Sequence, residues 1–256
     1  MKNKRVYRWL VVLGVLATIT VNGLANSLPI NGLNTGEISD RFEIYFVPAG
    51  YVFSIWFIIY VGLIAYAVYQ VLPGSKDNLR LDRAAGWLLL ASAANIAWIF
   101  FWHYLLFGWS LVAMTILLLS LINVYTQLEI GRSAADPGEF WLARVPISIY
   151  LGWISVATIA NVTQVLYYFD WSGWGIPDAV WATIMLGVGT LLGWIMALTR
   201  KDIAYLGVLI WAFIGIALEH QGTPLVTWSA WAAAALSAAA VLFTALKRSS
   251  VSTLVQ

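Results

Sequence analysis

Side chains able to do acid–base, nucleophilic or metal chemistry are scarce in this sequence. There is no cysteine, and the two histidines, His103 and His220, are far apart. No spacing typical of a zinc or haem site is present. Paired carboxylates, a Ser-His-Asp set and a glycine-rich phosphate loop are missing as well. The abundant functional groups are indoles and amides, with 15 tryptophans in the chain, and such groups bind and orient ligands rather than break bonds.

The amide and aromatic side chains of interest lie within long apolar stretches. They are Asn95, Trp98, Trp102, His103, Asn123, Gln127, Tyr150, Trp153, Asn161 and Gln164. An amide in hydrocarbon needs a hydrogen-bond partner, so we expect these amides to face the interior of a helix bundle. Two interpretations stay open: hydrogen bonding between helices, or a pocket whose flat aromatic walls hold a large apolar molecule while amides orient it.

The elements that carry these residues are predicted to be transmembrane helices. With 61% hydrophobic and 10% charged residues, the composition excludes an ordinary soluble domain and a nucleic-acid-binding protein. Spanning a membrane takes about 20 apolar residues. Eight stretches qualify, at 6–28, 47–72, 84–106, 108–128, 145–168, 179–199, 203–219 and 225–246. The sequence therefore predicts an all-α integral membrane protein with eight spans.

The basic residues predict the orientation of these helices. With eight spans and a cytoplasmic N-terminus, every basic residue except Arg41 falls on the cytoplasmic side, as the positive-inside rule requires. Both termini are then cytoplasmic, and we expect a multi-pass protein of the cytoplasmic (inner) membrane. An alternative treats residues 1–25 as a cleaved secretory signal, which leaves seven spans with the same orientation.

Charges within the predicted spans are too few to indicate ion coupling. No lysine is placed to hold a retinal, and only Glu129 and Glu219 among the carboxylates approach the bilayer, both at helix ends. An intramembrane charge is otherwise a mark of function. The longest outer loop, residues 29–46, is acidic and carries apolar residues such as Ile38 and Phe42. It is interpreted as a lid over the bundle or as a solvated loop.

Three blocks of sequence combine aromatic residues with proline, glycine or asparagine at fixed spacings. The first is Phe46-Val47-Pro48-Ala49-Gly50-Tyr51-Val52-Phe53-Ser54-Ile55-Trp56, followed by Tyr60. This block resembles a motif of the TspO/MBR family of translocator and tryptophan-rich sensory proteins, F-x-P-P-G-W-V-F-G-P-V-W-x-x-x-Y. It has Ala49 in place of the second proline, Tyr51 in place of tryptophan and one residue fewer before Trp56. The spacing of four between Trp56 and Tyr60 keeps both on one helix face.

The other two blocks lie on the third and fifth predicted helices. Asn95-Ile96-Ala97-Trp98, Phe100-Phe101 and Gly108-Trp109 are similar to the family's N-W-A-W, F-F and G-W, with one residue missing between blocks. Tyr150-Leu151-Gly152-Trp153, Ala157 and Asn161 match the family's pattern without a gap. Their order and placement on the expected helices indicate family membership.

The resemblance covers residues 6–170 and implies a five-helix unit with a ligand pocket. We therefore expect a TspO/MBR-like unit at 1–170, and three additional helices with a short cytoplasmic tail at 171–256. The implied ligand is protoporphyrin IX or a haem-like tetrapyrrole, with no required cofactor and no metal; a homodimer is left open. The implied pocket residues are Trp56, Asn95, Trp98, Trp109, Trp153, Ala157 and Asn161. The implied structural motif comprises Pro48, Gly50, Tyr51, Tyr60, Phe100, Phe101 and Tyr150.

Three functions are compared. The leading one is a membrane-embedded binding or sensory protein for porphyrin-type tetrapyrroles or similar large apolar ligands, with lipid and the small ligand as its partners. The alternative is a transporter or exporter of a tetrapyrrole or another lipophilic metabolite. Light-dependent breakdown of a bound porphyrin is the third and is disfavoured, because some relatives carry tryptophan where this chain has Val162.

Overall fold

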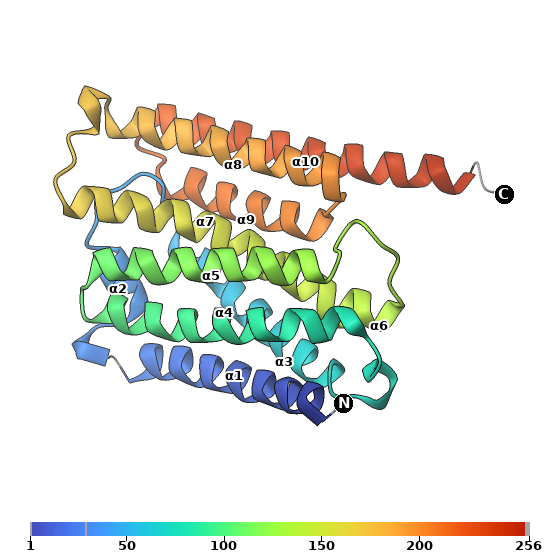
Figure 1. Cartoon of the computed structure of the whole chain (residues 1–256). Coiled ribbons are helices and arrows are strands. Elements are labelled where there is room, and N and C mark those ends of the chain that lie inside the picture. The colour runs from blue at the N-terminus through green and yellow to red at the C-terminus, as the bar shows by residue number, and fades with distance from the viewer. Residues whose placement is uncertain (1, 29, 254–256) are drawn as a thin grey trace. The chain divides into compact units, whose positions relative to one another are not determined.

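The fold is built of apolar helices. The computed structural model describes residues 2–28 and 30–253, with side chains from 5 to 28 and from 30 to 247. Residues 254–256, at the end of the expected tail, lie outside the described residues. The principal helices are α1 (Lys2–Ser27), α3 (Ile55–Tyr69), α4 (Leu79–His103), α5 (Phe107–Gln127), α7 (Val145–Tyr168), α8 (Asp178–Arg200), α9 (Ile203–Glu219) and α10 (Pro224–Thr253) (Figure 1). The expected all-α membrane fold is confirmed.

All eight predicted apolar stretches are helical, and seven are long enough to cross a bilayer. The eighth is α9, whose 17 residues give a length of roughly 25 Å, less than a hydrocarbon core of about 30 Å. The second predicted span, 47–72, begins later than expected. A 3-10 turn at Gly50–Ser54 precedes α3, and Pro48 lies just before it, where a proline disfavours the helical conformation of the residue that precedes it.

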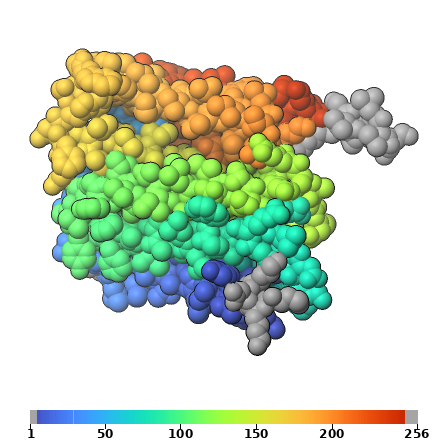
Figure 2. Space-filling view, viewed as in Figure 1, coloured from blue at the N-terminus to red at the C-terminus, as the bar shows by residue number. Residues whose placement is uncertain are grey.

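The chain divides into two compact units. Unit 1 contains residues 1–43 and 54–170, and unit 2 contains residues 44–53 and 171–256. In unit 1 the helices form a closed ring, because α1 packs on α4, α4 on α5, α5 on α7, α7 on α3, and α3 on α1. Figure 2 shows α1, α4 and α5 as adjacent blue, teal and green bands.

The two ends of unit 1 differ. One end carries α2 (Thr35–Ser39) and the other carries α6 (Pro137–Glu139) and the start of α1 (Figure 1). The first is called the outer end below and the second the inner end, after the orientation that the basic residues predict. Residues 30–43, called the lid below, contain the 3-10 turn Ile30–Gly32 and α2.

Unit 2 contains α8, α9, α10 and the connecting segment, residues 44–53. Helix α10 packs on both α8 and α9. A Cβ atom built on Gly189 would lie 2.9 Å from the Phe213 ring, and one built on Gly193 would lie 2.9 Å from Leu209 Cδ1. The pair of small residues on α8 therefore serves close packing within this chain.

Candidate functional site

An aromatic group lies where α3 meets α7. The Trp56 ring stacks on Tyr60 with centroids 5.5 Å apart, and it meets Tyr150 at 6.0 Å and Trp153 at 6.3 Å. The two helices can approach closely because Gly62 has no side chain: a Cβ atom built there would lie only 2.9 Å from Pro146 Cβ. Trp56, Tyr60, Tyr150 and Trp153, which the resemblance singles out, are thus brought together.

A buried chain of polar groups joins α1, α4 and α7 beside this group. The Asn22 amide donates to Asn95 Oδ1 at 2.7 Å, and the Asn95 amide donates to the Tyr150 hydroxyl at 3.0 Å. Both asparagines are almost fully buried. Asn95 faces the bundle interior as expected, and its partners are other side chains of the bundle.

A second aromatic group lies nearer the outer end. Trp98 and Trp102 stack with centroids 5.4 Å apart and planes 18° apart. Trp98 Nε1 donates to Asn161 Oδ1 at 3.3 Å, and the Asn161 amide donates to Ser110 Oγ at 3.2 Å. Asn161 therefore fixes the Trp98 indole from α7. By contrast, the amide of Asn123 donates to Leu119 O of its own helix and joins no interhelical pair.

The lid is an ordered element that covers this second group. Ile38 is fully buried in one core cluster with Trp102, Phe107 and Val165. Trp102 Nε1 donates to Thr35 O at 3.3 Å, and a capping box of Asn34 and Glu37 closes the first turn of α2. Of the two interpretations of this loop, the structure supports the lid.

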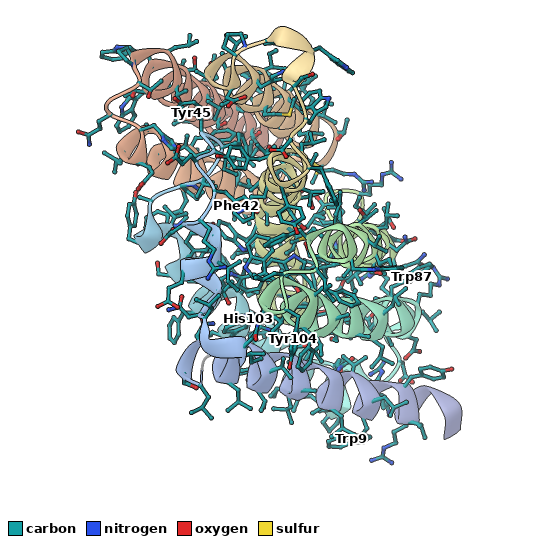
Figure 3. All side chains as sticks on the ribbon, turned by 90° about the vertical axis from the view of Figure 1, so that its left-hand side faces the viewer. Trp9, Phe42, Tyr45, Trp87, His103 and Tyr104 are labelled. Atoms are coloured by element: carbon teal, nitrogen blue, oxygen red, sulfur yellow. The ribbon has the colours of Figure 1, made fainter. Side chains whose placement is uncertain are left out.

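His103 anchors the lid from the end of α4. Its Nε2 lies 3.1 Å from Thr35 Oγ1 and its Nδ1 lies 3.2 Å from Ile30 O. Its backbone carbonyl accepts a hydrogen bond from the Asn31 amide at 3.1 Å. Figure 3 shows His103 and the lid residue Phe42 at this end of the unit. The histidine is fully buried and has a positioning role here.

A pocket of about 340 Å³ opens at the outer end. It is lined by Arg41, Phe42, Leu105, Phe107, Tyr167, Tyr168 and Asp170. Leu105 and Asp170 have φ angles of 59° and 51°, a left-handed conformation that side chains other than glycine avoid. The Phe42 ring meets Phe107 at 5.0 Å and Tyr167 at 6.1 Å. Aromatic walls with two charged groups can hold a flat, partly polar ligand.

Other predicted residues lie away from these groups. Trp109 is 60% exposed, with Phe101 as a ring neighbour at 6.2 Å, and Phe100 is 42% exposed. Ala157 is half-buried, one turn beyond Trp153 on α7. Exposed tryptophans near helix ends are typical of the membrane interface, and Trp109 has that environment in this structure.

The remaining motif residues, Pro48, Gly50 and Tyr51, belong to unit 2. There the backbone N–H of Ala49 donates to Gly215 O at 3.2 Å, and Trp211 Nε1 donates to Val52 O at 3.1 Å. The Tyr51 and Trp211 rings meet edge to face at 5.2 Å. Helix α9 therefore holds the connecting segment, which leads directly into α3.

His220, at the end of α9, makes a further contact with the connecting segment. Its Nε2 donates to Val47 O at 3.1 Å, and its ring meets Tyr45 at 5.5 Å. Burial lowers the pKa of His220, although the Val47 carbonyl and Glu219 favour the charged form. The neutral imidazole can make this hydrogen bond with the proton on Nε2.

Sequence reasoning missed a charge network at the inner end of unit 1. Arg8, 5% exposed, donates to Asp82 and to the carbonyls of Gln70, Ser75 and Asn78. The positive-inside rule accounts for the basic residues there without naming a partner for them, whereas the structure pairs them with Asp82 and Glu139.

Glu139 is the centre of the same network. It is fully buried and accepts from Arg80, Arg144 and Asn78 at 2.7–2.8 Å. The stretch Phe140–Arg144 is π-helical, and a π-helix brings residues five positions apart onto the same face. Arg144 therefore lies on the same face as Glu139. The sequence does carry a signal, since Asp136 caps the turn by accepting from the N–H of Glu139. That hydrogen bond holds the pKa of Asp136 below its usual range.

The comparisons with known proteins place this chain in a family. Among the described residues no group of His, Cys, Asp or Glu is suited to hold a metal. The model of the family described as TSPO-like protein matches residues 8–243. The chain belongs to this family. No match was found among curated proteins or among solved structures.

The family match covers both units. It continues well beyond residue 170, where the resemblance found in the sequence ends. Helices α8 and α9 and most of α10 are thus part of what defines this TSPO-like protein. Together with seven apolar helices of membrane length, the match makes it a multi-pass integral membrane protein of a ligand-binding and sensory kind.

Proposed function

We propose that this TSPO-like protein is a binding or sensory protein for a large, flat, apolar ligand of the tetrapyrrole class. The observation that carries the proposal is a continuous set of aromatic rings beneath the lid. Trp98 stacks on Trp102, Trp102 meets Phe107 at 5.3 Å, and Phe107 meets Tyr168 at 4.9 Å. Phe107 and Tyr168 line the outer pocket. Aromatic rings that line a pocket are surfaces of the kind that a planar macrocycle contacts.

The amides have an orienting role in this proposal. Asn161 accepts from Trp98 and donates to Ser110, and Asn95 bonds to Asn22 and Tyr150. Because these hydrogen bonds fix the side chains that form the aromatic walls, they preorganise those walls, which lowers the entropic cost of binding. The group formed by Trp56 and Trp153 is proposed as the deeper wall, with Ala157 one turn beyond Trp153 on the same face of α7.

A titration of the purified protein with protoporphyrin IX tests the proposal. Tryptophan emission and the porphyrin Soret band are followed together in Trp98→Ala and Trp153→Ala variants. We expect saturable quenching, with affinity reduced about tenfold in each variant, since each removes an aromatic wall. Trp228→Ala is the matched control, because Trp228 is 72% exposed in unit 2. Absence of saturable binding, or an equal loss in the control, contradicts the proposal.

A further inference from the structure

Two opposite charges line the outer pocket without pairing. Among the residues that the structure describes, no ion pair within 4.0 Å joins Arg41 to Asp170, and neither side chain has a hydrogen-bond partner. Every other basic side chain lies on the predicted inner side. Arg41 is thus an unused cation beside the aromatic walls, at the end of unit 1 where a guanidinium is least expected.

The backbone of the lid fixes the position of Arg41. Its N–H donates to Ile38 O at 3.3 Å, and the N–H of Phe42 donates to Ser39 O at 3.2 Å. Ile38 is fully buried, and Ser39 Oγ accepts from Gln164 of α7 at 3.2 Å. The lid therefore fixes the backbone that carries Arg41, whose exposed side chain lines the pocket.

The pocket combines these features into one recognition surface. Guanidinium groups bind carboxylates and phosphates through paired hydrogen bonds and are only weakly hydrated. Phe42, Phe107 and Tyr168 supply an apolar wall next to that charge. The Asp170 carboxylate opposes a second negative charge in the same space. The arrangement suits an apolar ligand whose edge carries an acidic group.

We propose that Arg41 determines specificity by binding an acidic group on the ligand, and that Asp170 weakens the binding of additional negative charge. This inference rests on the proposed function, since it assigns the ligand class to the same site. The acidic group has two chemical sources, the carboxylate of a tetrapyrrole or the phosphate of an anionic lipid.

The test compares a diacid with its neutral ester. Protoporphyrin IX and its dimethyl ester are titrated into the full chain in phosphatidylcholine nanodiscs, with Arg41→Gln and Asp170→Asn as the two variants. We expect Arg41→Gln to weaken binding of the diacid about threefold to tenfold, since a partly exposed charge pair is lost. Asp170→Asn is expected to strengthen it by about twofold to threefold. Binding of the ester changes less than twofold in both variants.

Each outcome of the test decides one point. Equal effects of Arg41→Gln on the two ligands, or no effect on either, overturn the inference while the proposed function stands. If the unmodified protein binds neither ligand, the proposed function itself fails. Nanodiscs containing phosphatidylglycerol identify the source of the acidic group. Weaker binding of protoporphyrin IX in the unmodified protein but not in Arg41→Gln shows that lipid phosphate occupies the same site.

Discussion

Units 1 and 2 are held together by different interactions. In unit 1, buried hydrogen bonds and ion pairs connect helices that are distant in sequence, as in Asn22 to Asn95 and Arg80 to Glu139. In unit 2, small residues bring helices close together: Gly189 and Gly193 of α8 meet Phe213 and Leu209, and Ala197, Leu206 and Ala240 form a core cluster. The interior of unit 1 is thus rich in polar and aromatic side chains, whereas the helices of unit 2 are held together by close packing of small residues.

The difference is one of chemistry. Polar groups in hydrocarbon cost free energy unless each finds a partner, so the paired amides and ions of unit 1 select which helices pack together. Close packing of small residues supplies stability without such selectivity. Through Gly215, Trp211 and His220, unit 2 holds the connecting segment. That segment joins the lid to α3 along the chain.

The largest effect is expected at the centre of the charge network. Glu139→Gln removes the only carboxylate that an ion pair within 4.0 Å gives the buried Arg144 among the described residues, and one of the two that pair with the half-buried Arg80. It should cost about 3–5 kcal/mol of unfolding free energy. Glu129→Gln is the control, because the Glu129 side chain is 41% exposed and lies 3.6 Å from Arg80. Its expected cost is below about 1 kcal/mol. Denaturant unfolding in detergent measures both; equal costs would show that the network is not a stability centre.

Steric packing in unit 2 is tested at Gly215. A Cβ there would overlap the Val52 side chain and lie 3.0 Å from Pro48 Cβ, so Gly215→Ala should cost about 1–3 kcal/mol. Gly207→Ala on the same helix is the matched control, since nothing lies within 4 Å of its Cβ position. It should stabilise α9 by up to about 1 kcal/mol. A melting temperature that changes equally in both variants would contradict the close contact.

Much of the fold was predictable from the sequence, because apolar length and the placement of basic residues follow directly from the bilayer. Less of the candidate site was predictable from the sequence. Trp98 and Asn161 were found through family spacing, yet Trp109, chosen on the same grounds, is exposed. Spacing on one helix does not reveal which neighbour covers it. The grip of α9 on residues 44–53 depends on a contact between residues about 160 positions apart, Val52 and Trp211, which no local pattern encodes.

A smaller effect is expected from the amide that fixes Trp98. Asn161→Leu removes the hydrogen bonds to Trp98 and Ser110, and the loss should be about 1 kcal/mol, the scale measured for such bonds in membranes. Asn123→Leu removes only a bond to its own helix and should cost less than about 0.5 kcal/mol. Thermal unfolding followed by tryptophan emission compares them. If Asn123→Leu costs as much, interhelical amide bonding does not distinguish unit 1.

The smallest effect is a pH dependence located in unit 2. Burial lowers the pKa of His220 below its usual 6.5, so the unfolded chain binds a proton more readily than the folded one. Stability should therefore be fully present above about pH 6.5 and decrease as the pH falls toward the lowered pKa.

Melting temperatures between about pH 5 and pH 8 measure this dependence, and His220→Gln should flatten the profile. The groups facing the imidazole are the Val47 carbonyl, the Tyr45 ring and the Glu219 carboxylate. A profile that His220→Gln leaves unchanged would assign the dependence to another group.

Asp136 has a pKa below its usual 3.8 and contributes only at still lower pH, where stability falls as that carboxylate protonates. The two pH ranges therefore distinguish a loss of stability at the His220 contact with the connecting segment from one at the inner end of unit 1.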